Sequence, residues 1–246
     1  MRVADGMPPN LDRDRCALFL DLDGTLADLA PRPDDVIPLH ERTGILRRLV
    51  ESMDGRVAVL TGRALSEADR ILESAVVPVA AVHGLVRRLS PGTVVSVLPS
   101  PNLSQAKVTL DALAADHPGL LVEDKEASVA LHYRLAPEAR ATVRDTTEQL
   151  SRALGLVLQE GAMVSELRTA GPNKGDSLRA FMAWPPFTGA VPVAIGDDLT
   201  DEDAFAAADA LGGYGILVGE PRPTRARYRL GSVAEVLAWL NPGTGA

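Results

Sequence analysis

The sequence is short of cysteine and of long apolar runs. Cys16 is the only cysteine among 246 residues, which excludes a disulfide within the chain. The longest apolar stretches, such as residues 76–82, are far too short to cross a bilayer. The segment MRVADGMPPNLDRDR carries acids and prolines where a secretion signal needs an apolar core. We therefore expect a soluble cytoplasmic protein without a membrane partner.

Basic residues are also in the minority. The chain has 25 Lys and Arg against 33 Asp and Glu, a formal net charge of −8. Nonspecific binding to nucleic acid requires a basic surface, so a nucleic-acid partner is not expected. A small anionic substrate is still allowed, because a local patch can oppose the sign of the whole chain.

The stretch FLDLDGTL places two acids at the end of an apolar run. On a strand, Asp21 and Asp23 point the same way because they are two positions apart. Two carboxylates facing one direction repel each other, and a divalent cation would offset that repulsion.

Apolar runs that end in polar residues or glycine recur along the chain, with helical patterns at residues 40–53 and 64–74. Such runs are typical of strands buried on both faces of a parallel sheet. We therefore predict an α/β fold with a doubly wound, mostly parallel sheet. Its five strands are expected at residues 16–24, 56–63, 76–84, 191–198 and 214–219.

Ligands of such sheets bind beyond the carboxyl ends of the strands. Several polar side chains fall at those ends, which is stronger evidence for a site than any one of them alone. They are Asp21, Asp23, Thr61, His83, Asp197 and Asp198.

The middle of the chain has a different pattern. Helices are expected at residues 103–117 and 137–154, and hairpins at residues 120–134 and 156–168, the second turning at Glu160-Gly161. This order is α+β. We therefore predict an inserted cap domain at residues 99–168, and a catalytic core domain made of residues 1–98 and 169–246.

The two acids of FLDLDGTL suit a hydrolysis with a covalent intermediate. Asp21 can attack phosphorus and form an aspartyl phosphate, which divides hydrolysis into two easier steps. Asp23 can give a proton to the leaving alkoxide and then take one from the attacking water. Mg²⁺ would neutralise the phosphate, with Asp197 and Asp198 completing its oxygen ligands.

Three further groups could bind phosphoryl oxygens: the Lys174 ammonium, the Thr61 hydroxyl and the Gly62 amide. Taken singly, these motifs also have structural interpretations, because Asp-Gly pairs form turns and acids after a strand cap helices. Four such features in this order, three of them at strand ends, favour an enzyme.

These motifs resemble those of the haloacid dehalogenase superfamily. FLDLDGTL, LTGR, Lys174 in GPNKG, and GDDLTDEDAF are similar to its four motifs. VEDKEASVALHYR at residues 122–134 resembles the cap signature of the trehalose-6-phosphate phosphatase branch. SELR before GPNKG, and VHG at residues 82–84, resemble other motifs of that branch. The resemblance covers residues 16–240.

The resemblance implies a Mg²⁺-dependent phosphatase that hydrolyses trehalose 6-phosphate through an aspartyl phosphate, with a sugar-phosphate synthase as a pathway partner. Asp21 would be the nucleophile and a metal ligand. Asp23 would be the acid–base and bind Mg²⁺ through its carbonyl. Asp197 would be the third protein ligand, supported by Asp198, while Thr61 and Lys174 would hold the phosphate. The expected substrate-binding residues are Gly62, Arg63, His83, Glu123, Lys125, Arg134 and Glu166.

Other functions stay open at this point. Thr169 stands where the branch commonly has proline, and a phosphorylated pseudo-disaccharide would need much the same cap. A sugar phosphomutase or phosphotransferase would use the same aspartyl phosphate. A non-catalytic sensor is disfavoured because binding alone does not need both Asp21 and Asp23, and a dehalogenase gives Asp23 no evident role.

Overall fold

The structure is a computed structural model that describes residues 2–4 and 6–241. The chain forms two compact units. The first unit contains the N-terminal and C-terminal parts of the chain, and the second contains residues 31–33 and 96–171. That the second unit acts as a cap domain stays a prediction. Among the described residues, no helix has the length and apolar character needed to cross a membrane.

The first unit is built on an eight-stranded sheet. All five predicted strands are present and lie in it as parallel neighbours. In spatial order the strands are β14 (Tyr228–Leu230), β12 (Tyr214–Val218), β11 (Val191–Gly196), β2 (Cys16–Leu20), β3 (Val57–Leu60), β4 (Val79–Ala81), β5 (Val86–Ser90) and β6 (Thr93–Ser96). The predicted α/β fold with a mostly parallel sheet is therefore confirmed.

Three strands of this sheet were not predicted: β5, β6 and β14. They lie toward its two edges, and β5 pairs antiparallel with β4. β5 carries two arginines and is only half-buried, while the whole of β6 is exposed. Strands with an open face or edge do not need the continuous apolar run that indicates a buried strand, so their pattern was too weak to recognise.

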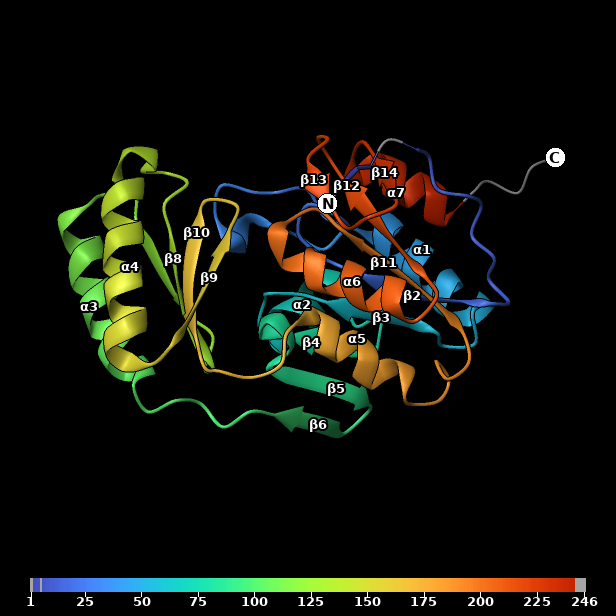
Figure 1. Cartoon of the computed structure of the whole chain (residues 1–246), viewed down its shortest axis with the longest axis horizontal. Coiled ribbons are helices and arrows are strands. Elements are labelled where there is room, and N and C mark those ends of the chain that lie inside the picture. Colours follow the sequence, from blue (N-terminus) through green and yellow to red (C-terminus); the bar gives the residue numbers. More distant parts are fainter. Residues whose placement is uncertain (1, 5, 242–246) are drawn as a thin grey trace. The chain divides into compact units, whose positions relative to one another are not determined.

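Helices cover the sheet on both faces. Ala17 and Phe19 of β2 belong to a cluster that includes Phe181 and Phe205. Leu18 and Leu20 point to the opposite face of the sheet and are fully buried as well. Helix α5 packs against α6, and α1 against α7 (Figure 1). The helices are α1 (His40–Ser52), α2 (Leu65–Leu72), α5 (Lys174–Met182), α6 (Glu202–Ala210) and α7 (Val233–Leu240). Short 3-10 turns occur at η1 (Pro33–Asp35), η2 (Val82–Gly84) and η4 (Leu199–Asp201), and a small sheet pairs β1 (Arg2–Val3) with β13 (Pro223–Thr224).

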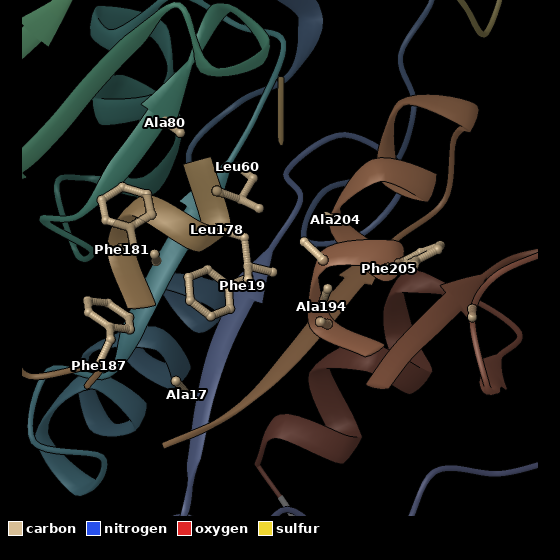
Figure 2. Packing of buried hydrophobic residues seen from close by; sticks show 14 of the residues in the cluster. Ala17, Phe19, Leu60, Ala80, Leu178, Phe181, Phe187, Ala194, Ala204 and Phe205 are labelled. Carbon is tan, nitrogen blue, oxygen red and sulfur yellow. The ribbon is translucent and has the colours of Figure 1, made fainter. Parts of the chain in front are cut away.

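Aromatic rings form the centre of one core cluster, shown in Figure 2. The ring of Phe19 lies 5.5 Å from that of Phe187 and 6.4 Å from that of Phe181, measured between centroids. Such tilted ring contacts add stability beyond the area that they bury. They attach α5 to the strand that leads into the FLDLDGTL motif.

The second unit is a four-stranded antiparallel sheet with two helices on one face (Figure 1). Its core joins Leu103 and Leu110 of α3 to Leu131 and Leu167 of the sheet. The strand order is β7 (Leu121–Asp124), β8 (Ser128–His132), β10 (Val164–Arg168) and β9 (Val157–Gly161); the helices are α3 (Leu103–Asp116) and α4 (Arg140–Leu154), the latter preceded by η3 (Pro137–Ala139). The predicted α-β-β-α-β-β order is found.

The position predicted for the second hairpin turn was wrong. Gly161 is still paired, with Val164, so the turn consists of Ala162 and Met163 rather than Glu160-Gly161. Met163 adopts the left-handed conformation, with φ of 64°. The glycine suggested the turn, but here a non-glycine residue takes the positive φ.

We expect Phe181→Ala to lower the free energy of unfolding by about 3–5 kcal/mol, because it removes a ring from the packed cluster and leaves a cavity. Urea denaturation would measure this loss. Leu211→Ala, at a position that is 46% exposed in the same unit, is the control and should change stability little. Equal losses in the two variants would contradict the cluster's role.

Candidate active site

The first cluster of predicted residues lies at the carboxyl ends of β2 and β11. These strands are parallel neighbours, with Leu20 paired to Ile195. Asp21 follows β2 directly, and its amide donates to the Ile195 carbonyl at 2.9 Å. Asp197 follows β11. Adjacent parallel strands therefore bring together two acids that are far apart in the sequence.

Lys174 connects this cluster to α5. It is the first residue of that helix, which Asn173 caps through a capping box with Asp176. Its Nζ donates to Asp21 Oδ1 at 2.8 Å and to Asp201 Oδ1 at 2.7 Å, and the residue is only 3% exposed. Burial disfavours the ammonium, but the two carboxylates outweigh this effect and raise the pKa of Lys174.

Asp201 is a site residue that the sequence analysis did not identify. Its second oxygen accepts from the Asp198 amide at 3.1 Å, and a side chain at Gly196 would collide with it. The spacing of Asp198 and Asp201 is that of a helix cap, and both residues do form a capping box. Such spacing indicates only a helix start, and the additional contact of Asp201 with Lys174 has no local signature in the sequence.

Three carboxylates of the described residues lie close enough to hold one cation. Oxygen atoms of Asp21, Asp197 and Asp201 all lie within 4.8 Å of one another. Burial raises the pKa of Asp21 well above its ordinary value, against the opposing effect of Lys174 and with the help of the two neighbouring acids. Burial, with the repulsion of Asp201 and Asp198, raises the pKa of Asp197 to about 7. Hard oxygen donors with excess negative charge fit a divalent cation such as Mg²⁺.

Gly24 makes room for this carboxylate group. It has φ of +74°, and a Cβ at this position would collide with the carboxylate of Asp197. The Gly of FLDLDGTL therefore has a left-handed backbone conformation and lies close to the Asp197 carboxylate. Both features favour glycine over residues with a side chain.

The side chain of Asp23 points to a different partner. Arg63 donates to it from Nε at 2.7 Å and from Nη2 at 2.8 Å, a bidentate pair. The structure thus places Arg63, predicted to bind substrate, against the predicted acid–base. Asp198, predicted to support the metal, accepts from the Leu199 amide at 2.7 Å and caps η4.

The turn that follows β3 contacts η2. It contains Thr61 and Gly62, and η2 contains His83. The Thr61 hydroxyl accepts from the Arg63 amide at 3.1 Å, and the Thr61 carbonyl accepts from the His83 amide at 2.9 Å. A Cβ on Gly62 would lie 2.6 Å from the His83 ring, so the ring lies against the glycine backbone. Thr61 is fully buried, and both Val82 and His83 have positive φ.

A second cluster lies in the second unit, on the sheet face opposite α3 and α4. Glu123 and Glu166 lie opposite the same residue, Ala130, so they share a face. Lys125 Nζ lies 2.9 Å from Glu166 Oε2 and 3.7 Å from Glu123 Oε2. His132 Nε2 lies 2.8 Å from the same Glu123 oxygen. Burial opposes ionisation of Glu123, but His132 and Lys125 outweigh it and lower the pKa of this carboxyl.

Arg134 is placed differently from the other predicted sugar-binding residues. Its guanidinium donates to the Ala162 carbonyl, at the turn of the second hairpin, at 2.9 Å. His132, in contrast, was not among the predicted site residues and belongs to the cluster through Glu123. The contact of His132 with Glu123 depends on how β7 pairs with β8, so the local sequence pattern around His132 does not indicate it.

Comparison with known proteins gives consistent results. The family model described as trehalose-phosphatase matches residues 19–234. A probable trehalose-phosphate phosphatase of Sinorhizobium fredii is 42% identical over 90% of this chain and 84% of its own length. Trehalose-6-phosphate phosphatase of Escherichia coli is 37% identical over 94% and 87%. A bifunctional trehalose-6-phosphate synthase/phosphatase of Thermoproteus tenax is 35% identical over 88% of this chain and 30% of its own length.

Solved structures agree with these relatives. A trehalose-6-phosphate phosphatase related protein has a TM-score of 0.76 and 28% identity, covering 92% of this chain and 95% of its own. A haloalkanoate superfamily phosphatase from Bacteroides thetaiotaomicron has a TM-score of 0.62 at 20% identity, covering 96% and 97%, which is a likeness of fold. The family model and the curated relatives therefore confirm the resemblance to the trehalose-6-phosphate phosphatase branch, and the solved structures agree with the predicted fold.

The raised pKa of Asp197 predicts a pH dependence of the metal-free protein. The folded state keeps this proton up to about pH 7, whereas the unfolded chain loses it near the ordinary value of 3.8. The stability from this group is complete below the lower value and is lost as the pH rises toward the upper one. We expect the urea concentration at the unfolding midpoint to fall between about pH 5 and about pH 8, measured with a chelator present. The fall should be steeper for the wild type than for Asp197→Asn.

Asp209→Asn is the control, because Asp209 is an exposed acid of the same unit, paired at the surface with Arg227. It should keep the wild-type slope. Parallel profiles for the wild type and Asp197→Asn would contradict the prediction.

Proposed function

The chain belongs to the trehalose-phosphatase family, and we propose that it hydrolyses trehalose 6-phosphate to trehalose and phosphate through an aspartyl phosphate. The observation that carries this function is the buried Asp21 carboxylate, held by Lys174 beside two further acids at a strand end. The activity is that of a phosphoric monoester hydrolase.

The first step is attack on phosphorus by a carboxylate oxygen of Asp21. A bond forms between that oxygen and phosphorus while the bond from phosphorus to the sugar oxygen breaks. Asp23 gives a proton to the departing alkoxide. Lys174 fixes the direction of the Asp21 carboxylate through Oδ1, and the Lys174 ammonium offsets the charge that the phosphate brings.

The second step returns the enzyme to its starting state. Water attacks the phosphorus of the aspartyl phosphate, and the Asp23 carboxylate accepts the water's proton. The bond between phosphorus and Asp21 breaks, which releases phosphate. The bidentate contact with Arg63 holds the ionised Asp23 carboxylate in a defined direction for accepting this proton.

Mg²⁺ is the proposed cofactor, and the residues present fit it. Both oxygens of Asp201 already accept hydrogen bonds, from Lys174 and from the Asp198 amide. We therefore assign Asp201 to holding Lys174, and the carboxylates of Asp21 and Asp197 to the ion. When bound, the ion would neutralise phosphate charge and favour ionised carboxylates.

Glu123, Lys125 and Glu166 are the proposed sugar-binding residues. A disaccharide presents many hydroxyl groups, and this cluster offers charged donors and acceptors on one sheet face. Each charge-assisted hydrogen bond contributes about 1.5–3 kcal/mol. The apolar core on the other face holds the strands that carry them, so the charged groups of the cluster are held in place for polar recognition.

The bifunctional relative supports one further proposal, that this chain acts together with a synthase of the same sugar phosphate. In that relative, the part matched by this chain is 30% of a protein whose name includes both activities. A cytoplasmic location stays a prediction from the sequence.

We expect Asp21→Asn to lower kcat by roughly a thousandfold or more, because the amide is a poor nucleophile. Phosphate release from trehalose 6-phosphate measures turnover, and circular dichroism confirms that the variant is folded. Asp28→Asn, an exposed acid in the same segment, should leave turnover unchanged. Near-wild-type turnover in Asp21→Asn would rule out the covalent route.

Glu123→Gln tests the sugar-binding assignment. We expect kcat/KM for trehalose 6-phosphate to fall about tenfold to a hundredfold, because a charged hydrogen-bond acceptor is lost. An aryl phosphate has no second sugar, so its kcat/KM should stay nearly unchanged. Glu148→Gln on the outer surface of α4 is the matched control and should affect neither substrate. Equal losses for both substrates in Glu123→Gln would mean that Glu123 serves folding rather than recognition.

A further inference from the structure

Arg222 binds the backbone of the turn that carries Asp197. It lies between β12 and β13, and its Nη2 donates to the Asp197 carbonyl at 3.2 Å and to the Asp198 carbonyl at 2.8 Å. Its Nη1 donates to the Glu202 carboxylate. One planar guanidinium thus joins two consecutive carbonyls of the acidic turn to the first residue of α6.

Glu202 is itself held in place. Its buried carboxylate accepts from the Thr224 hydroxyl and from the Arg225 amide, both at 2.7 Å. The segment of residues 222–225 is therefore fastened to α6 by three donors on one carboxylate. Arg222 extends from this fastened segment to the turn at residues 197–198, so its position does not depend on the turn that it binds.

The direction of the Asp197 carboxylate depends on this turn. Fixing the carbonyls of residues 197 and 198 fixes the peptide planes on both sides of the Asp198 Cα, and restricts the backbone that carries the Asp197 side chain. The Asp197 carboxylate also lies against the Gly24 backbone, where a Cβ would collide with it. The guanidinium also brings positive charge to a turn whose acids, Asp197, Asp198 and Asp201, repel one another.

We propose that Arg222 is a positioning residue for the metal site: it holds the Asp197–Asp198 turn in the conformation that binds Mg²⁺. The inference rests on the metal assignment of the proposed function and not on the sugar substrate. Residues that hold a metal ligand in place from behind commonly change metal affinity by about tenfold to a hundredfold when replaced.

Arg222→Lys tests the proposal, since Lys keeps the charge but cannot reach Glu202 and both carbonyls with one planar group. Mg²⁺ binding is measured without substrate, from the MgCl₂ concentration that gives half of the rise in Tm, and by electron paramagnetic resonance with Mn²⁺. We expect the apparent Kd for both ions to rise about tenfold in Arg222→Lys. In the steady state, the Mg²⁺ concentration for half-maximal activity should rise similarly, with kcat at saturating Mg²⁺ within about twofold of the wild type.

Arg227→Lys is the matched control, because Arg227 lies on the same C-terminal segment and pairs with Asp209 at the surface. It should bind both ions as the wild type does. Glu202→Gln provides a second variant that weakens the same contact from its other end. Since both substitutions act on one turn, the double variant with Arg222→Lys should bind Mg²⁺ no more weakly than Arg222→Lys alone.

The outcomes separate this inference from the proposed function. If the wild type binds Mg²⁺ and Arg222→Lys binds it within twofold, the positioning role is wrong while the metal assignment stands. If Arg222→Lys loses metal-free Tm without any change in ion affinity, Arg222 is structural only, and the proposal is overturned. If neither ion binds the wild type, both the metal assignment and this inference are overturned.

Discussion

One electrostatic constraint governs the candidate active site of the first unit: three carboxylates, two of them buried, meet beside the ammonium of Lys174. Asp21, Asp197 and Asp201 carry more negative charge than Lys174 can offset. Burial and the repulsion between the neighbouring acids both favour the protonated forms, which is why the pKa values of Asp21 and Asp197 are raised. A divalent cation relieves the same excess and leaves the carboxylates ionised. The proposed metal site therefore suits a hard divalent cation, because its donors are carboxylate oxygens with excess negative charge.

The fold holds these charges together through the backbone. The Asp21 amide is bound to the neighbouring strand, the Asp201 side chain to the Asp198 amide, and the Asp197 turn to Arg222. Lys174 begins α5, a helix packed on the sheet by the Phe181 ring and its neighbours. Because strands and helices rather than free loops determine these positions, the repelling groups cannot relax by moving apart.

In the second unit, successive side chains along each strand point to opposite faces of the sheet, and the two faces differ in chemistry. One sheet face packs on α3 and α4. The other face carries Glu123 and Glu166, with the Lys125 ammonium near both carboxylates. This polar face is held by the apolar one, so its charges are ordered before any ligand arrives. The motif VEDKEASVALHYR predicted Glu123 and Lys125, and SELR predicted Glu166. The contact of His132 with Glu123, however, joins two strands and depends on their register.

The sequence by itself determined the local features: the buried strands, the acids at their carboxyl ends, the α+β insertion and the family. Each follows from a short pattern, because periodicity and turn chemistry act over a few residues. Only the tertiary structure decided which side chains meet. Lys174 contacts Asp21 across 153 positions, and Asp23 pairs with Arg63 across 40. Asp201 has a dual role that its capping pattern concealed. Such pairs depend on strand order and helix packing, which lie beyond the range of any local pattern.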